Sequence, residues 1–134
     1  MKSNLTWIKN FQTVVDNGRT HTMVMDLPPG KDGDDTGPTA LEVLVMSLTG
    51  CIGTIYALVA KKMRIDIEEL EVKLEADKGP DDPTITAVRA EVIVKADASE
   101  KKLERCLETT MNTCPVGVLY TQAGVDVKTS LTKL

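Results

Sequence analysis

The feature that most constrains this sequence is an apolar stretch without a charged residue between Glu42 and Lys61. It lies within TALEVLVMSLTGCIGTIYALVAKKM, residues 39–63. Thr39 and Glu42 have the spacing of a capping box at a helix start, and the lysines at the other end suit the negative end of a helix dipole. The segment is therefore predicted to be one helix over 39–63, about 36 Å long.

The uncharged core of this helix, Val43 to Ala60, is 18 residues long, which is at the lower limit for a membrane span. Small and polar residues dilute it, and strand patterns flank it, so a soluble protein is favoured over a membrane span. A domain of this length has a radius of gyration of about 14 Å and cannot cover such a helix on all sides. A stripe of small residues recurs at helical spacing: Ser47, Gly50, Thr54 and Ala57. We therefore expect a homodimer with the helix near its interface.

Length and composition favour a single domain over 1–134 and exclude several classes of function. The net charge is −4 and only 3% of residues are aromatic, which argues against a nucleic-acid partner. Three cysteines with no CxxC spacing do not resemble a secreted disulfide framework, and a single histidine, His21, leaves few ligands for zinc. The N-terminus lacks the pattern of a signal peptide, so a cytoplasmic protein with reduced thiols is expected.

The remaining segments alternate between strand and helix patterns in separate runs. Strands are predicted at 4–9, 11–16 and 20–26, with a hairpin at Asn17-Gly18; at 69–77 and 84–96, joined by a loop at 78–83; and at 125–134. Ser99 caps a predicted amphipathic helix at 98–113, and a short helix is predicted from Cys114-Pro115 to Gly124. Strands and helices in separate runs indicate an α+β fold.

A Pro-, Gly- and Asp-rich segment at 27–38 is predicted to be a loop. Its Asp32, Asp34 and Asp35 could suggest calcium, but the distant glutamate of an EF-hand loop is missing. A solvated, mobile loop is therefore favoured over a calcium site.

The three cysteines have different sequence contexts. Cys114 precedes Pro115 at a helix start, where unpaired N–H groups favour a thiolate. Cys51 lies in the middle of the apolar helix, where it could be only a small core residue. Cys106 shares a helix face with Leu103 and Leu107, so we interpret it as structural.

The segment GPTALEVLVMSLTGC (37–51) resembles the long helix of the osmotically inducible protein C / organic hydroperoxide resistance (OsmC/Ohr) superfamily. TCPVGVL (113–119) resembles its second motif, a Cys-Pro that opens a short helix. The resemblance covers nearly the whole chain. It implies an intertwined α+β homodimer in which Cys51 is the peroxidatic thiolate and Cys114 the resolving thiol.

The family holds its thiolate with an arginine from the N-terminal strands, braced by a glutamate on the long helix. Carried over, Arg19 and Glu42 are the candidates, although Arg19 could be an exposed hairpin residue and Glu42 only a helix cap. Glu42 lies nine positions before Cys51, one fewer than in the best-known peroxidase branch, which turns its side chain by about 100°. This register, and the spacing of His21 and Asp26, resemble the OsmC-like branch better.

The resemblance implies a thiol-dependent peroxidase that reduces organic hydroperoxides, regenerated by an external dithiol and requiring no metal or organic cofactor. The serious alternative is a non-enzymatic dimer or a binder of apolar ligands, in which the cysteines are spectators. Gly50-Cys51-Ile52-Gly53 matches the GxxG of a KH loop, but its apolar helix and acidic chain argue against RNA binding.

Overall fold

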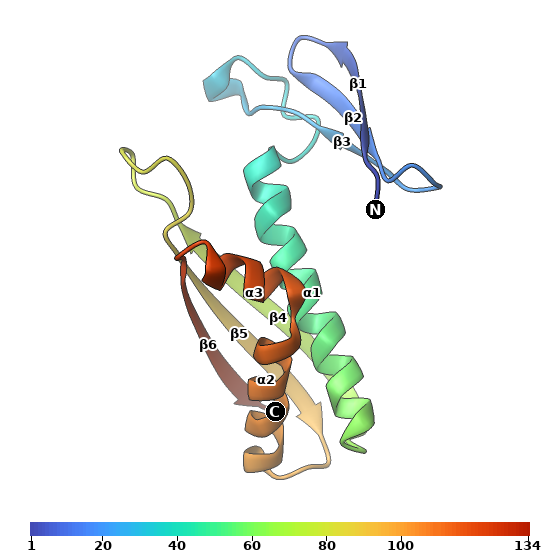
Figure 1. Ribbon diagram of the computed structural model, residues 1–134, viewed down its shortest axis with the longest axis vertical. Helices are drawn as coiled ribbons and strands as arrows, with labels where there is room; N and C mark the ends of the chain where they lie inside the picture. Colours follow the sequence, from blue (N-terminus) through green and yellow to red (C-terminus); the bar gives the residue numbers. More distant parts are fainter. The chain divides into compact units, whose positions relative to one another are not determined.

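In a computed structural model that describes residues 1–134, the chain divides into two units, Met1–Leu44 and Val45–Leu134. Helix α1 (Ala40–Lys62) begins in the first unit and continues into the second (Figure 1). The Thr39 hydroxyl accepts from the Glu42 N–H, and the Glu42 carboxylate accepts from the Thr39 N–H, at 3.2 and 2.7 Å. The predicted capping box is therefore confirmed. Both ends of α1 lie within one residue of the predicted limits, 39 and 63.

The N-terminal unit contains an antiparallel sheet in the order β1 (Asn4–Lys9), β2 (Gln12–Asp16) and β3 (Thr22–Met25). The predicted hairpin between β2 and β3 is confirmed, with Asp16 paired to Thr22 across a loop of residues 17–21. Gly18 adopts φ +68 in this loop and donates its N–H to the Asp16 carboxylate at 2.6 Å. The sequence Asn17-Gly18 thus marks the reversal of the chain, although the loop is longer than a two-residue turn.

Asp26 organises the loop that follows β3. Its side chain is 4% exposed and accepts from the N–H groups of Leu27, Asp34 and Thr36 and from the Thr36 hydroxyl. These bonds, first that of the Thr36 hydroxyl, lower the pKa of Asp26. The loop contains a short 3-10 helix, η1 (Pro29–Lys31). The expected solvated loop is thus anchored by one buried carboxylate, which the sequence reading did not foresee.

The C-terminal unit is built on a mixed sheet in the order β4 (Ile67–Asp77), β5 (Ala87–Ala96) and β6 (Asp126–Lys133). β4 and β5 form the predicted antiparallel hairpin, whereas β5 and β6 are parallel because a helical crossover connects them. That crossover consists of α2 (Glu100–Thr113) and α3 (Pro115–Gln122). The helices cover one face of the sheet (Figure 1), which confirms the predicted α+β fold.

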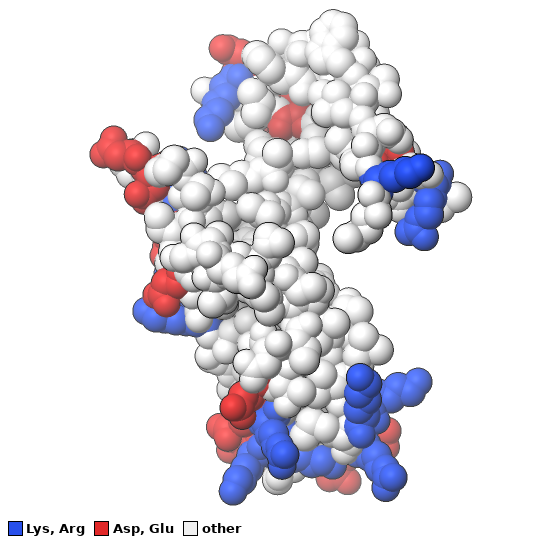
Figure 2. All heavy atoms as spheres, viewed as in Figure 1, with Lys and Arg blue, Asp and Glu red and all other residues white.

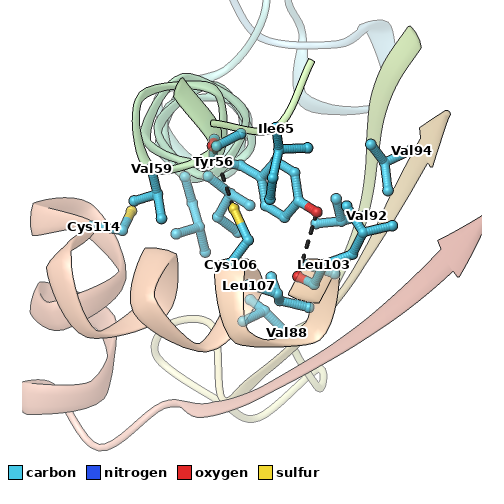
Figure 3. Close-up of a cluster of buried hydrophobic side chains, with 14 of the residues drawn as sticks. Tyr56, Val59, Ile65, Val88, Val92, Val94, Leu103, Cys106, Leu107 and Cys114 are labelled. Carbon is cyan, nitrogen blue, oxygen red and sulfur yellow. Dashed lines mark hydrogen bonds between the residues drawn. The ribbon is translucent and has the colours of Figure 1, made fainter. Parts of the chain in front are cut away.

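The core of this unit lies between α1, α2 and the inner face of β5 (Figure 3). β5 buries alternate residues from Val88 to Ala96, as its sequence pattern predicts. Tyr56 is fully buried; its hydroxyl donates to the Leu103 carbonyl at 3.4 Å, and its own carbonyl accepts from the Cys106 thiol at 3.7 Å. Cys106 is therefore a core residue, in agreement with its predicted structural position.

Helix α1 has the length and composition of a membrane span, yet one of its sides is packed into this core. The buried side carries Leu48, Ile52, Tyr56, Val59 and Ala60. Along this side, α1 is a core helix of the C-terminal unit. On another side, the small-residue stripe of Ser47, Gly50, Thr54 and Ala57 is exposed.

Candidate active site

The structure brings Cys51 of α1 and Cys114 together, although 62 residues separate them in the sequence. The Cys114 thiol donates to the Cys51 sulfur, and the two Sγ atoms are 2.7 Å apart. Cys51 is half-buried and Cys114 is fully buried. Both are free thiols at a separation from which a disulfide bond of about 2.05 Å can form with little movement.

Cys114 is fixed at the junction of α2 and α3, where it ends one helix and caps the next. Its N–H donates to the Thr110 carbonyl at 2.8 Å, which closes the last turn of α2. Its sulfur accepts from the Gly117 N–H at 3.4 Å, as an N-cap side chain does. Pro115 at the first position of α3 needs no acceptor, because it has no N–H. The local sequence thus directs the Cys114 side chain back over the start of α3.

Burial first, and then the hydrogen bond to Cys51, raise the pKa of the Cys114 thiol to about 11. The N–H groups of Gly117 and Val116 act in the opposite direction, toward a lower pKa, but they do not outweigh burial. The helix-start effect predicted from the sequence is therefore present, but burial outweighs it, and the expectation of an acidic Cys114 is wrong. The thiol is protonated at neutral pH, which agrees with its role as hydrogen-bond donor to Cys51.

The other candidate residues lie in the N-terminal unit. Arg19 is exposed in the loop between β2 and β3, where its backbone N–H donates to the Asn17 side chain at 3.0 Å. Glu42 caps α1, and its hydrogen bonds to Thr39 lower its pKa. His21 lies 3.1 Å from the Asn17 amide through its Nδ1 atom. A role for Arg19 or Glu42 at the thiol pair stays a prediction.

Sequence reasoning missed one contributor to the site, the backbone N–H of Gly117. Its signal was present, because the third residue after an N-cap is where a capping side chain finds its donor. A Cβ at this position would lie 3.5 Å from the Cys114 sulfur, in ordinary contact. No group of three His, Cys, Asp or Glu side chains is arranged to hold a metal ion. The chemistry that this arrangement can support is that of two adjacent thiols.

The fold and the thiol pair define an α+β protein with a dithiol between a long central helix and a helix–helix junction. The family model for OsmC-like proteins matches residues 33–130, and the chain belongs to this family. This result confirms the resemblance found in the sequence.

Relatives and solved structures agree with this membership. The chain is 23% identical to Protein YhfA of Escherichia coli, over 92% of this chain and 91% of that protein. Its fold is similar to an OsmC-like protein from Mycoplasma pneumoniae, with a TM-score of 0.87, 14% identity and coverage of 99% and 96% of the two chains. It is also similar to the organic hydroperoxide resistance protein OhrB of Bacillus subtilis, with a TM-score of 0.65, 18% identity and 98% coverage of both.

Proposed function

We propose that this protein is a cysteine-based peroxidase that reduces organic hydroperoxides in a peroxide or stress response. The observation that carries the proposal is the 2.7 Å approach of the Cys51 and Cys114 sulfur atoms. Cys51 is the more accessible sulfur, and Cys114 is the protonated partner that is ready to form a disulfide. The structural similarity to proteins described as organic hydroperoxide resistance proteins supports the same chemistry.

In the proposed reaction, the Cys51 thiolate attacks one oxygen of the hydroperoxide and the O–O bond breaks. Cys51 takes the terminal hydroxyl oxygen and becomes a sulfenic acid, and the alkoxide takes a proton from solvent and leaves as the alcohol. The Cys114 sulfur then attacks the Cys51 sulfur; the hydroxyl group leaves with the Cys114 proton as water, and a disulfide forms. An external dithiol reduces this disulfide by exchange and restores both thiols. The cycle needs no metal and no organic cofactor.

The Cys51 thiolate requires a positive charge nearby, since apolar surroundings alone favour the protonated thiol. We propose Arg19 for this role and Glu42 as the carboxylate that orients it. The Glu42 carboxylate is held in one position at the start of α1, because it accepts a hydrogen bond from the Thr39 N–H.

We further propose that the protein works as a cytoplasmic homodimer. The N-terminal sheet buries almost none of its apolar side chains: Leu5 and Trp7 of β1 are 62% and 64% exposed. A three-stranded sheet without a covered apolar face is not stable alone. α1 likewise exposes Met46, and beside it the small-residue stripe allows close approach of another backbone. A second subunit would cover both surfaces.

The experiment compares two variants under single-turnover conditions with an organic hydroperoxide. Cys51→Ser should abolish peroxide consumption. Cys114→Ser should consume one equivalent and leave a sulfenic acid on Cys51 that a dimedone-type reagent traps. Cys106→Ala is the matched control and should behave as the wild-type protein. If Cys51→Ser remains active while Cys114→Ser is inert, the roles are exchanged; if neither substitution changes the reaction, the cysteines are spectators and the proposal fails.

A further inference from the structure

Asp26 is the only charged side chain that the protein buries, and the proposed reaction does not use it. A buried carboxylate is costly unless its charge is compensated, and Asp26 forms no ion pair. Four hydrogen bonds compensate it instead. Oδ1 accepts from the Leu27 N–H at 2.8 Å. Oδ2 accepts from the N–H groups of Asp34 and Thr36 at 3.3 and 3.2 Å and from the Thr36 hydroxyl at 2.7 Å. Every donor belongs to the loop 27–38, so Asp26 holds this loop against the end of β3.

Two further contacts seat the end of this loop on the N-terminal sheet. The Gln12 amide, at the start of β2, donates to the Thr36 hydroxyl oxygen at 2.7 Å. Because that oxygen already accepts this bond, the Thr36 hydroxyl proton points to Asp26. The next residue, Gly37, lies so close to β3 that a Cβ would stand 2.3 Å from the Val24 carbonyl oxygen. The loop therefore ends in a close approach to the sheet that only glycine allows.

One peptide group connects this seat to the first turn of α1. The carbonyl of Pro38 accepts from the Asp26 N–H at 3.3 Å. The N–H of the same peptide group, that of Thr39, donates to the Glu42 carboxylate at 2.7 Å. A peptide group is planar and rigid, so a shift of the loop at Asp26 is passed on to the Glu42 carboxylate.

The position of Glu42 matters because the helices that carry the thiols offer no other carboxylate near them. Glu42 is the only acidic residue of α1, and the stretch from Val43 to Ala60 is uncharged. α3 carries no charged residue at all. Figure 2 shows the corresponding uncharged surface over the middle of α1 and over α3 on the face in view. In the proposed mechanism, the place of the Glu42 carboxylate decides where the guanidinium of Arg19 stands.

We propose that Asp26 is the positioning residue for Glu42. Through the loop 27–38 and the peptide between Pro38 and Thr39, it holds the Glu42 carboxylate where the reaction needs it. The inference rests on the proposed function, in which Glu42 orients the cation that stabilises the thiolate. Asp26 takes no part in the chemistry, because its own carboxylate is occupied by the four donors of the loop. Its removal should therefore slow the reaction only through Glu42.

The test is a double-mutant cycle on the second-order reaction of the reduced full chain with tert-butyl hydroperoxide. Asp26→Asn turns an NH2 group toward the N–H donors of the loop and should slow the reaction about ten- to hundredfold, as Glu42→Gln should. The double variant should be no slower than the slower single variant, because both changes remove the same interaction. Additive losses would show that Asp26 acts independently of Glu42 and would overturn the proposal. An unchanged rate in Glu42→Gln would overturn it as well.

Amide hydrogen exchange supplies a readout that does not depend on turnover. Asp26→Asn should speed exchange at the N–H groups of Thr39 and Glu42, which form the capping box. Faster exchange only in the loop, at Asp34 and Thr36, with an unchanged reaction rate would show that Asp26 merely holds the loop, and the proposal would be wrong. A wild-type protein that consumes no hydroperoxide would refute the proposed function. Exchange at Thr39 and Glu42 would then still decide whether Asp26 holds this carboxylate.

Three more variants complete the design. Thr36→Val removes one donor and keeps the charge of Asp26, and it takes the place of Asp26→Asn if that variant does not fold. Thr36→Ser keeps the hydroxyl and should react at the wild-type rate. The matched control is Asp82→Asn, since the Asp82 carboxylate accepts the Gly79 N–H at 2.9 Å in the loop 78–83. This control should change neither the reaction rate nor the exchange at Thr39. A control as slow as Asp26→Asn would show a general effect of lost charge and overturn the proposal.

Discussion

Removal of the Cys114 thiol should reduce the loss of stability that the protein suffers at high pH. Burial holds the pKa of Cys114 at about 11 in the folded chain, whereas an unfolded cysteine titrates near 8.5. The folded state thus keeps a proton that the unfolded state releases. This contribution to stability is fully present below about pH 8.5 and is lost as the pH rises through about 11.

The size of the effect follows from these two pKa values. Between about pH 8 and pH 10 the unfolded thiol ionises almost completely while the folded thiol remains protonated, which destabilises the wild-type protein by about 2 kcal/mol. Cys114→Ser lacks this titration. Other groups with raised pKa values, including Tyr56 and Cys106, titrate in both proteins and cancel in the comparison.

The assay is urea unfolding of reduced wild-type protein and of Cys114→Ser, each at both pH values, with the free energy of unfolding from linear extrapolation. The wild-type protein should lose about 2 kcal/mol more than the variant. If the serine variant does not fold, Cys114→Ala takes its place in the comparison. Equal losses would mean that Cys114 is not held in its thiol form. A smaller loss in the wild-type protein would mean that Cys114 is a stabilised thiolate, which would make it the nucleophile.

Three further predictions concern other parts of the molecule. Thr39→Ala should lower the free energy of unfolding by about 1 kcal/mol in urea titrations, because the Glu42 N–H loses the Thr39 hydroxyl as its acceptor; an unchanged midpoint would contradict the capping box. Cys106→Ala should lower stability by about 1 kcal/mol and leave peroxide turnover at the wild-type rate; abolished turnover in a folded variant would contradict the Cys51–Cys114 pairing. The wild-type protein should sediment as a dimer at micromolar concentration, and Ala57→Arg should weaken that dimer; a stable wild-type monomer would refute the interface.

The elements of the fold could be read from the sequence because each carries its own local signal. The uncharged core and Thr39 predict α1. Ser99 predicts the start of α2, and in the structure its hydroxyl accepts from the Lys102 N–H. The alternation in β5 matched its buried face. Such signals depend only on neighbours within a few residues, so they survive without knowledge of the tertiary structure.

The pairing of β5 with β6 had no comparable signal. A parallel pair is made by the crossover between the strands, and the pattern of β6 alone does not state its partner. The anchoring of the loop at 27–38 was missed for a similar reason. Asp26 is the last residue of the predicted strand at 20–26, and only the folded loop brings the Thr36 hydroxyl and three N–H groups to its carboxylate.

The error about Cys114 shows which part of the site only the tertiary structure decides. A helix start lowers the pKa of a cysteine when solvent can reach the sulfur, and the sequence supplied only that half of the argument. Packing of α1 against the junction of α2 and α3 supplies the other half, because it removes water from Cys114 and presents the Cys51 sulfur as an acceptor. The result suits the proposed division of roles. In the proposed mechanism, a Cys114 that remains a thiol is a poor nucleophile toward peroxide, so the oxidant is expected to react at Cys51. The Cys114 sulfur lies 2.7 Å from the Cys51 sulfur, close enough to form a disulfide once the sulfenic acid is present.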